Sequence, residues 1–368
     1  MMKTIKFRFL TIVFSILFFS SSFAQIDDVT KMLSGFSEVP EDVGYLLDGY
    51  LTPYLNAFGT NLNAGWYNTA KPHKLGGFDL TITFNGTFIP TADKVFDLTG
   101  LKSLTPVNSD LEAPSVAGKG DGVPISYIEN FGGTDLTIAD FETPAGTGVS
   151  LIPTPNIQVG IGLVKGTEIL GRYVPTLKIG DLGKLGLWGF GIKHDIKQWI
   201  PVVEKLPVLN ISILGGYTKY KSTVGLSLNS EDFNTSDLTV TNNSTITSFS
   251  DQELLMGVKS FTLDLLVSAD IPVVTFYGGF GIGTVKSNIG LNGTFPLPEV
   301  NSSGTIPYLE VTDVSLQESK DPVDIDNKMK YARANIGMRL KLGVLTLHGD
   351  YTLAKYKVVT AGIGISFR

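Results

Sequence analysis

Two side chains near the end of the sequence have the types and spacing of an acid–base pair. His348 and Asp350 are two positions apart, so in a β-strand they would project from the same face. A carboxylate beside an imidazole can orient the ring for proton transfer. Hydrolysis would also need a nucleophile, and the sequence around the pair offers none in a recognisable context. We therefore expect that the protein is not an enzyme.

A second segment has oxygen ligands at alternate positions, as calcium-binding loops do. The stretch DPVDIDN contains Asp321, Asp324, Asp326 and Asn327. It lacks both the glycine at the turn and the bidentate glutamate of such loops, so a solvated acidic loop is the better interpretation. The chain has no cysteine, which excludes disulfides, thiolate metal sites and cysteine nucleophiles. We expect neither a metal site nor a cofactor.

The other candidates are ionisable or phenolic side chains that alternate with apolar ones. In a barrel they would face the interior, where two roles are open to them. They would either line the route of a ligand or form a lattice of salt bridges and hydrogen bonds that fills the lumen. The candidate lumen-lining residues are Arg172, Lys178, Asp264, Tyr277, Arg333, Arg339, His348 and Asp350.

The elements that would position these side chains are β-strands. In residues 78–84, for example, the even positions are apolar and the odd positions are Asp or Thr, a period of two that no helix gives. One apolar and one polar face fit either a soluble sandwich or an all-β transmembrane antiparallel barrel. The predicted strands are 60–70, 76–89, 94–101, 155–164, 168–180, 184–194, 208–221, 253–269, 273–287, 331–342, 344–353 and 357–368.

Both ends of the chain favour the membrane barrel. Basic residues precede a short apolar run, and the stretch from Ser22 to Ala24 suits a signal peptidase, so residues 1–24 are predicted to be a signal peptide. The last strand alternates and has Phe367 next to the chain end. It resembles the signal with which outer-membrane barrels of Gram-negative cells present themselves to the assembly machinery. We expect residues 59–368 to form an outer-membrane barrel, with membrane lipid and that machinery as partners.

Connection lengths support an even number of strands. We count about twelve, and a hairpin hidden in 102–154 would raise the number to fourteen. If residue 60 enters from the periplasm, the long connections 102–154, 222–252 and 288–330 all lie outside the cell. The last strand would then close the barrel against a first strand near residues 61–70. Short periplasmic turns are predicted at Pro90–Asp93, Lys165–Thr167 and Asp270–Pro272.

The connection from His194 to Pro207 is long for a periplasmic turn. Ile196, Trp199 and Ile200 have the spacing of one face of a helical turn. Tryptophan prefers the headgroup depth of a membrane, which makes this segment an interfacial anchor. A docking site for a periplasmic protein is the alternative interpretation.

Residues 25–58 come before the first predicted strand and have apolar residues at helical spacing. Pro40 suits a first helical turn, and Glu41 and Asp42 favour a helix N-terminus. Two short helices are predicted, near 27–34 and 41–51. Because the apolar face needs burial, we expect this segment to plug the lumen rather than hang below the barrel. The plug residues are Leu47, Tyr50, Leu51, Tyr54 and Phe58.

The charge of the chain argues against nucleic acid as a partner. Loss of the three basic residues of the signal peptide lowers Lys and Arg from 29 to 26 against 35 acidic residues, so the formal charge changes from −6 to −9. A strongly acidic protein repels the phosphate backbone.

Two resemblances to known families follow from these features. The stretches YLTPYLNAFGTNLNAGWYNTAKPHKLGGFDLTIT (50–83) and GIKHDIKQWIP (191–201) resemble an uncharacterised family of outer-membrane barrels. The order of signal peptide, helical plug and barrel resembles FadL-like long-chain fatty-acid transporters, which implies fourteen strands. A plugged barrel with acidic loops and no catalytic set also suits passive, porin-like transport of a small hydrophobic ligand better than an open pore. The alternative is a non-transporting membrane anchor whose extracellular loops bind a partner.

Overall fold

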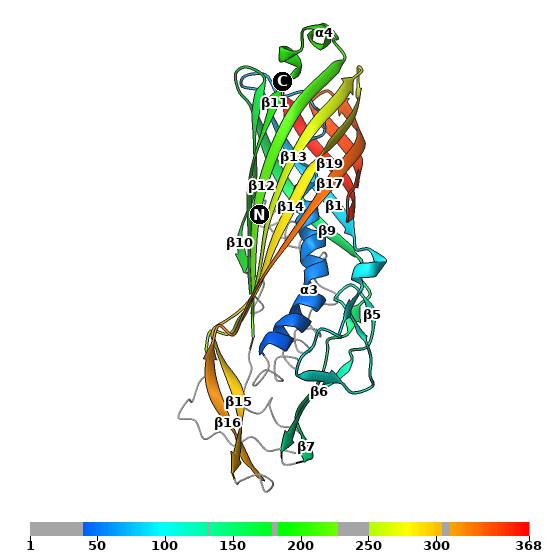
Figure 1. The fold of residues 1–368 in the computed structure, drawn as a ribbon. Coiled ribbons are helices and arrows are strands. Elements are labelled where there is room, and N and C mark those ends of the chain that lie inside the picture. Colours follow the sequence, from blue (N-terminus) through cyan, green and yellow to red (C-terminus); the bar gives the residue numbers. More distant parts are fainter. Residues whose placement is uncertain (1–39, 132, 179–182, 227–249, 304–309, 368) are drawn as a thin grey trace, which may run out of the picture.

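Ten strands of this chain close into an antiparallel barrel (Figure 1). The computed structural model describes residues 40–131, 133–178, 183–226, 250–303 and 310–367. The strand order around the barrel is β1-β19-β18-β17-β14-β13-β12-β11-β10-β9. The bounds are β1 Phe78–Phe88, β9 Leu151–Gly162, β10 Thr167–Lys178, β11 Gly183–Asp195, β12 Leu209–Gly225, β13 Glu253–Asp270, β14 Val274–Asn292, β17 Val323–Leu342, β18 Leu345–Leu353 and β19 Lys357–Phe367.

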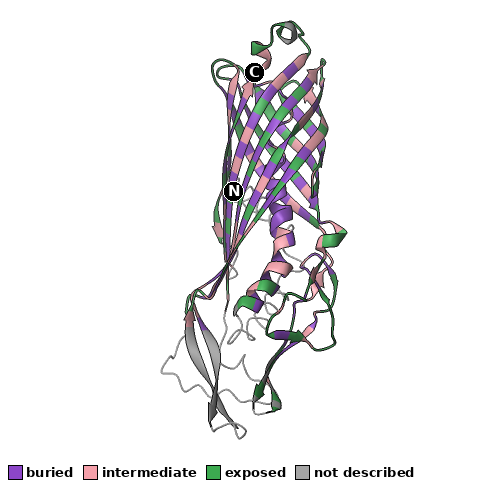
Figure 2. Cartoon of the chain, in the orientation of Figure 1, coloured by how far each residue is buried: buried purple, intermediate pink, exposed green. Residues whose placement is uncertain are grey.

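Alternation places apolar side chains on the outside of the barrel and polar ones inside. Along β1 the apolar residues from Phe78 to Phe84 are 37–45% exposed, whereas Thr81 and Thr83 are buried. Figure 2 shows the resulting stripes of exposed and buried residues on the wall. The terminal strand follows the predicted faces and pairs with β1, where Phe367 stacks on Phe78 with ring centroids 4.9 Å apart.

The two ends of the barrel differ in their connections. One end, here called the loop end, carries the connections from β1 to β9, from β12 to β13 and from β14 to β17, whose described parts include η1, the short strands β2 to β8 and the hairpin β15–β16 (Figure 1). The other end, the turn end, carries short turns such as 163–166 and 271–273. The loop-end elements are η1 Thr91–Asp93, β2 Val95–Asp97, β3 Leu104–Pro106, β4 Glu112–Pro114, β5 Lys119–Gly120, β6 Pro124–Phe131, β7 Thr134–Glu142, β8 Gly146–Thr147, β15 Thr294–Ser303 and β16 Glu310–Lys320.

The prediction of twelve strands is wrong by two, and both errors lie near the start of the chain. Residues 60–63 belong to a helix and 64–77 form no strand, while 94–101 contributes only the three-residue β2 outside the barrel. Because the errors are a pair, the count stays even and the long connections still share one end. The direction of β1 is reversed, however, and Pro90–Asp93 lies at the loop end. The barrel formed by the described residues has ten strands, not the fourteen that the fatty-acid transporter resemblance implies.

The segment before the barrel forms one helix, α3 (Pro40–Asn63), instead of a short helix at 41–51. It begins at the loop end and runs into the lumen (Figure 1). There Asp42 accepts hydrogen bonds from the backbone N–H groups of residues 102–104, at the start of β3. The helix predicted near 27–34 lies outside the described residues. No described helix combines the length and hydrophobicity needed to cross a membrane.

The long connection at the turn end folds into two short helical pieces, η2 (Lys197–Trp199) and α4 (Pro201–Glu204). Trp199 is 68% exposed, and its indole N–H donates to His194 Nε2 over 3.3 Å. An exposed indole at the edge of the apolar wall is suited to a membrane interface. The choice between anchor and docking site stays a prediction.

Candidate functional site

The lumen is filled by α3, and its C-terminal end is fixed to the wall by a buried arginine. The guanidinium of Arg172, on β10, donates to the carbonyl oxygens of Leu62 and Ala64, each over 2.9 Å, and to Gln158 Oε1 over 3.0 Å. The last carbonyls of a helix lack partners within the helix and carry partial negative charge. Arg172 therefore caps the plug where the helix ends.

A second arginine holds the opposite side of the same helix end. Arg333, on β17, donates to the carbonyl of Asn63, to Thr262 Oγ1 over 2.8 Å and to Asp264 Oδ2 over 3.4 Å. All four residues lie inside the barrel and are buried. Arg333 thus binds the end of the helix and forms a buried ion pair with Asp264 at the same time. Removal of either partner of this pair would leave an uncompensated buried charge.

After the end of α3, the chain continues through the lumen toward the turn end, and Trp66 in this segment packs against glycines of the wall. A Cβ on Gly216 of β12 would lie 2.7 Å from the indole, and one on Gly191 of β11 would lie 2.9 Å from it. The guanidinium of Arg172 stacks 3.7 Å above the same ring. On β14, Gly279 leaves space for the hydroxyl group of Tyr67, which a Cβ at this position would meet.

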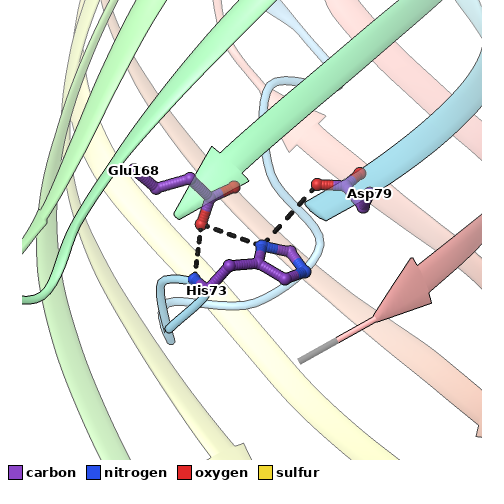
Figure 3. Close-up of side chains that lie close together, drawn as sticks. All are labelled: His73, Asp79 and Glu168. Atoms are coloured by element: carbon purple, nitrogen blue, oxygen red, sulfur yellow. Dashed lines mark hydrogen bonds and ion pairs between the residues drawn. The ribbon is translucent and has the colours of Figure 1, made fainter. Parts of the chain in front are cut away.

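Near the turn end, a cluster of buried charged residues ties the segment between α3 and β1 to the barrel wall (Figure 3). The backbone N–H of His73 donates to Glu168 Oε2 over 2.9 Å, and its Nδ1 lies 3.2 Å from Glu168 Oε2 and 3.7 Å from Asp79 Oδ1. Lys193 Nζ is 3.0 Å from the same Glu168 oxygen. His73 Nε2 also pairs with Ser366 Oγ over 3.0 Å, one residue before Phe367.

Histidine, aspartate and glutamate are metal-ligand types, and the ligand atoms of these three lie within 4.8 Å of one another. The ammonium group of Lys193 already balances the negative charge of Glu168. A metal ion is therefore not needed to supply that positive charge. The arrangement therefore fits an ion-pair lattice that ties the segment before β1 to β1, β10, β11 and β19 better than it fits a metal centre.

The structure buries most of the predicted lumen-lining residues but does not gather them into one site. Tyr277 donates to Asp350 Oδ2 over 3.0 Å, and Arg339 donates to Ser366 Oγ over 3.4 Å. His348 and Asp350 share a face, as expected, yet Asp350 is engaged by Tyr277. Lys178 is exposed, because the β10–β11 register shifts between Val174 and Leu177 and turns the following residues outward.

The wall of the barrel is split between β9 and β10 at the loop end. β9 pairs with β1 from Leu151 to Ile161 but with β10 only as far as the pair Gln158–Arg172. Beyond that point, residues 151–157 and 173–178, all described, form no ladder with each other. Prolines explain the split, because they have no N–H to donate to a ladder. They are Pro153, Pro155 and Pro175.

An apolar pocket of about 20 Å³ lies directly behind the split. Phe58 of the plug closes it from inside, and Thr154, Pro155 and Val174 line it at the two edges of the split. A groove of about 430 Å³ lies nearby on the outer part of the wall, and it shares Val174, Leu185 and Leu187 with the pocket. The side chains common to both therefore separate the groove from the lumen.

Four residues of these clusters were missed as site residues by sequence reasoning. Trp66 and His73 lay in or beside a falsely predicted strand, and Glu168 and Lys193 lie near strand ends. Alternation along the strands could have identified two of them. Glu168 lies on the same inward face of β10 as Arg172, and Lys193 lies on the same inward face of β11 as Gly191. The predicted plug residues Leu47, Tyr50, Leu51 and Phe58 are all buried on α3, and Tyr54 packs beside them.

No curated protein matches the chain. Among solved structures, it is similar to the translocator domain of the autotransporter NalP from Neisseria meningitidis, with 13% identity, 86% of this chain and 96% of that chain covered, and a TM-score of 0.29. It is also similar to the outer membrane protease OmpT from Escherichia coli, with 9% identity, 79% and 97% coverage and a TM-score of 0.31.

A third similar structure is the toluene transporter TbuX from Ralstonia pickettii, with 7% identity, 84% and 93% coverage and a TM-score of 0.25. TM-scores this low carry no argument about function. In sequence, residues 2–367 match a family of unknown function, DUF6588. The match spans nearly the whole chain, and the protein therefore belongs to the DUF6588 family.

Proposed function

We propose that this protein is an outer-membrane barrel that lets a small hydrophobic molecule cross the membrane passively. The outer-membrane location is supported by a closed sheet with apolar side chains outward and polar ones inward, since closure pairs the backbone groups of neighbouring strands everywhere except at the split between β9 and β10. The loop end then faces outside the cell and the turn end faces the periplasm. The proposal includes no catalytic step.

The observation that carries the transport proposal is the split between β9 and β10 with an apolar pocket behind it. A hydrophobic molecule gains little from an aqueous exit, whereas a lateral opening leads directly from the lumen into the apolar layer of the membrane. The groove outside and the pocket inside share three side chains, so a short displacement would join them.

The plug itself is too firmly held to leave the lumen during each passage. Arg172 and Arg333 bind the carbonyls of its C-terminal end, and both are buried. Phe58 is a better gate, because rotation of one side chain opens the pocket without breaking those bonds. Its ring contacts Tyr220 of β12, with centroids 4.6 Å apart.

Polar groups near the pocket favour a ligand with one polar end. Asn156, next to Pro155, is buried, and neither of its amide atoms has a hydrogen-bond partner among the described residues. Its cross-strand neighbour Thr83 has an unpartnered hydroxyl as well. Such groups are normally satisfied by water or by a ligand. We assign the substrate class as a small, mainly apolar molecule with a single hydroxyl or carbonyl group.

The first test removes the gate. In cells that produce the Phe58→Ala variant, influx of a small apolar dye such as N-phenylnaphthylamine should rise above that of the wild type. Leu47→Ala is the matched control, because Leu47 is also buried on α3 but does not line the pocket. Equal influx in the wild type, in Phe58→Ala and in cells without the protein would refute transport.

A membrane anchor that binds a partner is the second candidate function. The hairpin β6–β7 projects at the loop end and exposes Ile128 at 46% (Figure 1). Crosslinking on intact cells that captures a stoichiometric partner, lost when residues 124–142 are deleted, would favour this role. Deletion of the same residues should leave dye influx unchanged if the transport proposal is correct.

A further inference from the structure

Exposed lysines form a girdle around much of the barrel at one level. Lys259 lies eleven residues before Asp270, the turn-end limit of β13. On five other barrel strands, lysines also lie ten to twelve residues from the turn-end limit. All are exposed and point outward from the wall. The girdle consists of Lys178, Lys184, Lys219, Lys221, Lys259, Lys286 and Lys330.

The girdle lies where the apolar surface of the barrel ends. At about 3.3 Å per residue and a strand tilt of about 40°, eleven residues rise about 28 Å along the barrel axis, close to the apolar band of about 25 Å typical of membrane barrels. On β13 the outward residues between the girdle and the turn end include Phe261, Leu263 and Leu265, each 39–47% exposed. The lysines therefore mark the membrane boundary at the loop end.

Several girdle lysines face one another directly across strands. Lys219 pairs with Lys259, and Lys259 pairs with Lys286. Like charges in such positions destabilise a sheet. Among the described residues, no carboxylate lies within 4.0 Å of a girdle ammonium group. Outward acidic residues such as Asp326 stand further toward the loop end, where Asn288 donates to Asp326 over 3.1 Å. In the described part of the chain, the row thus has no ion-paired counter-charge, and the outward Glu253 of β13 lies further toward the loop end, as Asp326 does.

We propose that the girdle binds the phosphate groups of an anionic membrane lipid in the loop-side leaflet. An amphiphile with phosphate above an apolar body matches ammonium groups above an apolar wall, and phosphates bridging neighbouring lysines would relieve their repulsion. The groove beside the split is lined by three of the girdle lysines, Lys184, Lys219 and Lys221, by Trp188 and by one carboxylate, Glu253, so its ionisable lining has a net positive charge. This inference rests on the proposed membrane location but does not depend on transport.

The test measures retained lipid by native mass spectrometry of the purified full-length protein. The probe is a bisphosphorylated lipid A, with its dephosphorylated form and inorganic phosphate as comparisons. The wild type should retain the phosphorylated lipid preferentially. Changing Lys219, Lys221, Lys259 and Lys286 to Gln should weaken retention by at least about tenfold, given roughly fivefold per surface lysine. The matched control changes the exposed Lys74, Lys119, Lys205 and Lys320 to Gln and should retain it.

Three outcomes would overturn the girdle assignment. The first is that the wild type and the girdle variant retain the phosphorylated lipid equally well. The second is that the wild type retains the dephosphorylated lipid as well as the phosphorylated one. The third is that inorganic phosphate displaces the bound lipid as effectively as free phosphorylated lipid does at the same concentration. Heat-modifiable migration of each variant on a gel shows whether the barrel has folded. A wild type that neither shows this migration nor inserts into neutral vesicles would refute the membrane barrel itself, which separates the two failures.

Discussion

Arg172 is the residue on which the plug depends most. Its guanidinium binds two backbone carbonyls at the end of α3, one amide on β9 and the face of Trp66, all in a buried lumen. A positive charge with several acceptors is stable there, and each charged hydrogen bond contributes roughly 1.5–3 kcal/mol. The sequence predicted an inward Arg172 from alternation, but its partners were hidden because residues 60–70 were interpreted as a strand.

Replacing Arg172 with Met should destabilise the folded barrel by about 3 kcal/mol or more, because at least two charged hydrogen bonds are lost. Unfolding in urea, followed by the heat-modifiable shift on a gel, measures the change. Lys205→Met at an exposed position should lie within about 0.5 kcal/mol of the wild type. Equal midpoints for the two variants would show that Arg172 does not hold the plug.

Two adjacent glycines provide a matched pair for the packing of Trp66. Gly216→Val should destabilise the barrel by about 1–3 kcal/mol, because its Cβ would approach the indole to 2.7 Å. Gly215→Val should change stability by less than about 0.5 kcal/mol, because a Cβ there meets nothing within 4 Å. The same urea assay decides, and similar losses at both positions would contradict the placement of Trp66.

At the scale of elements, the split between β9 and β10 has a direct readout in amide hydrogen exchange. Those amides of residues 173–178 that point toward β9 should exchange at least about tenfold faster than the amides of residues 168–172, since only the latter residues pair with β9, while amides that donate to β11 stay protected. β13 is the control, because it pairs with β12 and β14 along its length and should exchange slowly throughout. Uniform protection along β10 would mean that the wall is closed.

The ten barrel strands were predictable from the sequence because one face meets an apolar surround and the other a polar lumen, which imposes a period of two. The false strand at 60–70 fails for a physical reason. Trp66, Tyr67 and Ala70 are buried inside the lumen rather than placed on the outer wall, so their hydrophobicity says nothing about an outward face. The bulge between Val174 and Leu177 is equally invisible to alternation, and it moved Lys178 from the lumen to the girdle.

At the scale of the whole molecule, the direction of α3 sets the topology of the N-terminal region. Pro40 lies at the loop end, so a protease site inserted just before it should be cut by protease added to intact cells. A site inserted between Gly343 and Val344, in a turn-end connection, should be cut only after the outer membrane is permeabilised. The reverse pattern would mean that the barrel is inverted or that α3 enters from the periplasm.

The barrel architecture could be inferred from the sequence because it depends on patterns repeated along the chain. The candidate site could not, since it depends on where a ladder stops and which plug side chain stands behind the gap. Prolines 153, 155 and 175 were the one signal of the split. Only the three-dimensional pairing shows that they flank the same opening, with Phe58 behind it.

The most direct measurement of lateral passage bridges the split and follows dye influx. The chain has no cysteine, so Thr154→Cys and Val174→Cys supply the only thiols for a short bifunctional reagent. A control pair, Ile213→Cys with Leu265→Cys, spans paired strands of the closed wall. Bridging across the split should abolish protein-dependent influx of the apolar dye, while bridging the control pair should leave influx unchanged. Unchanged influx after complete bridging at 154 and 174 would contradict lateral passage.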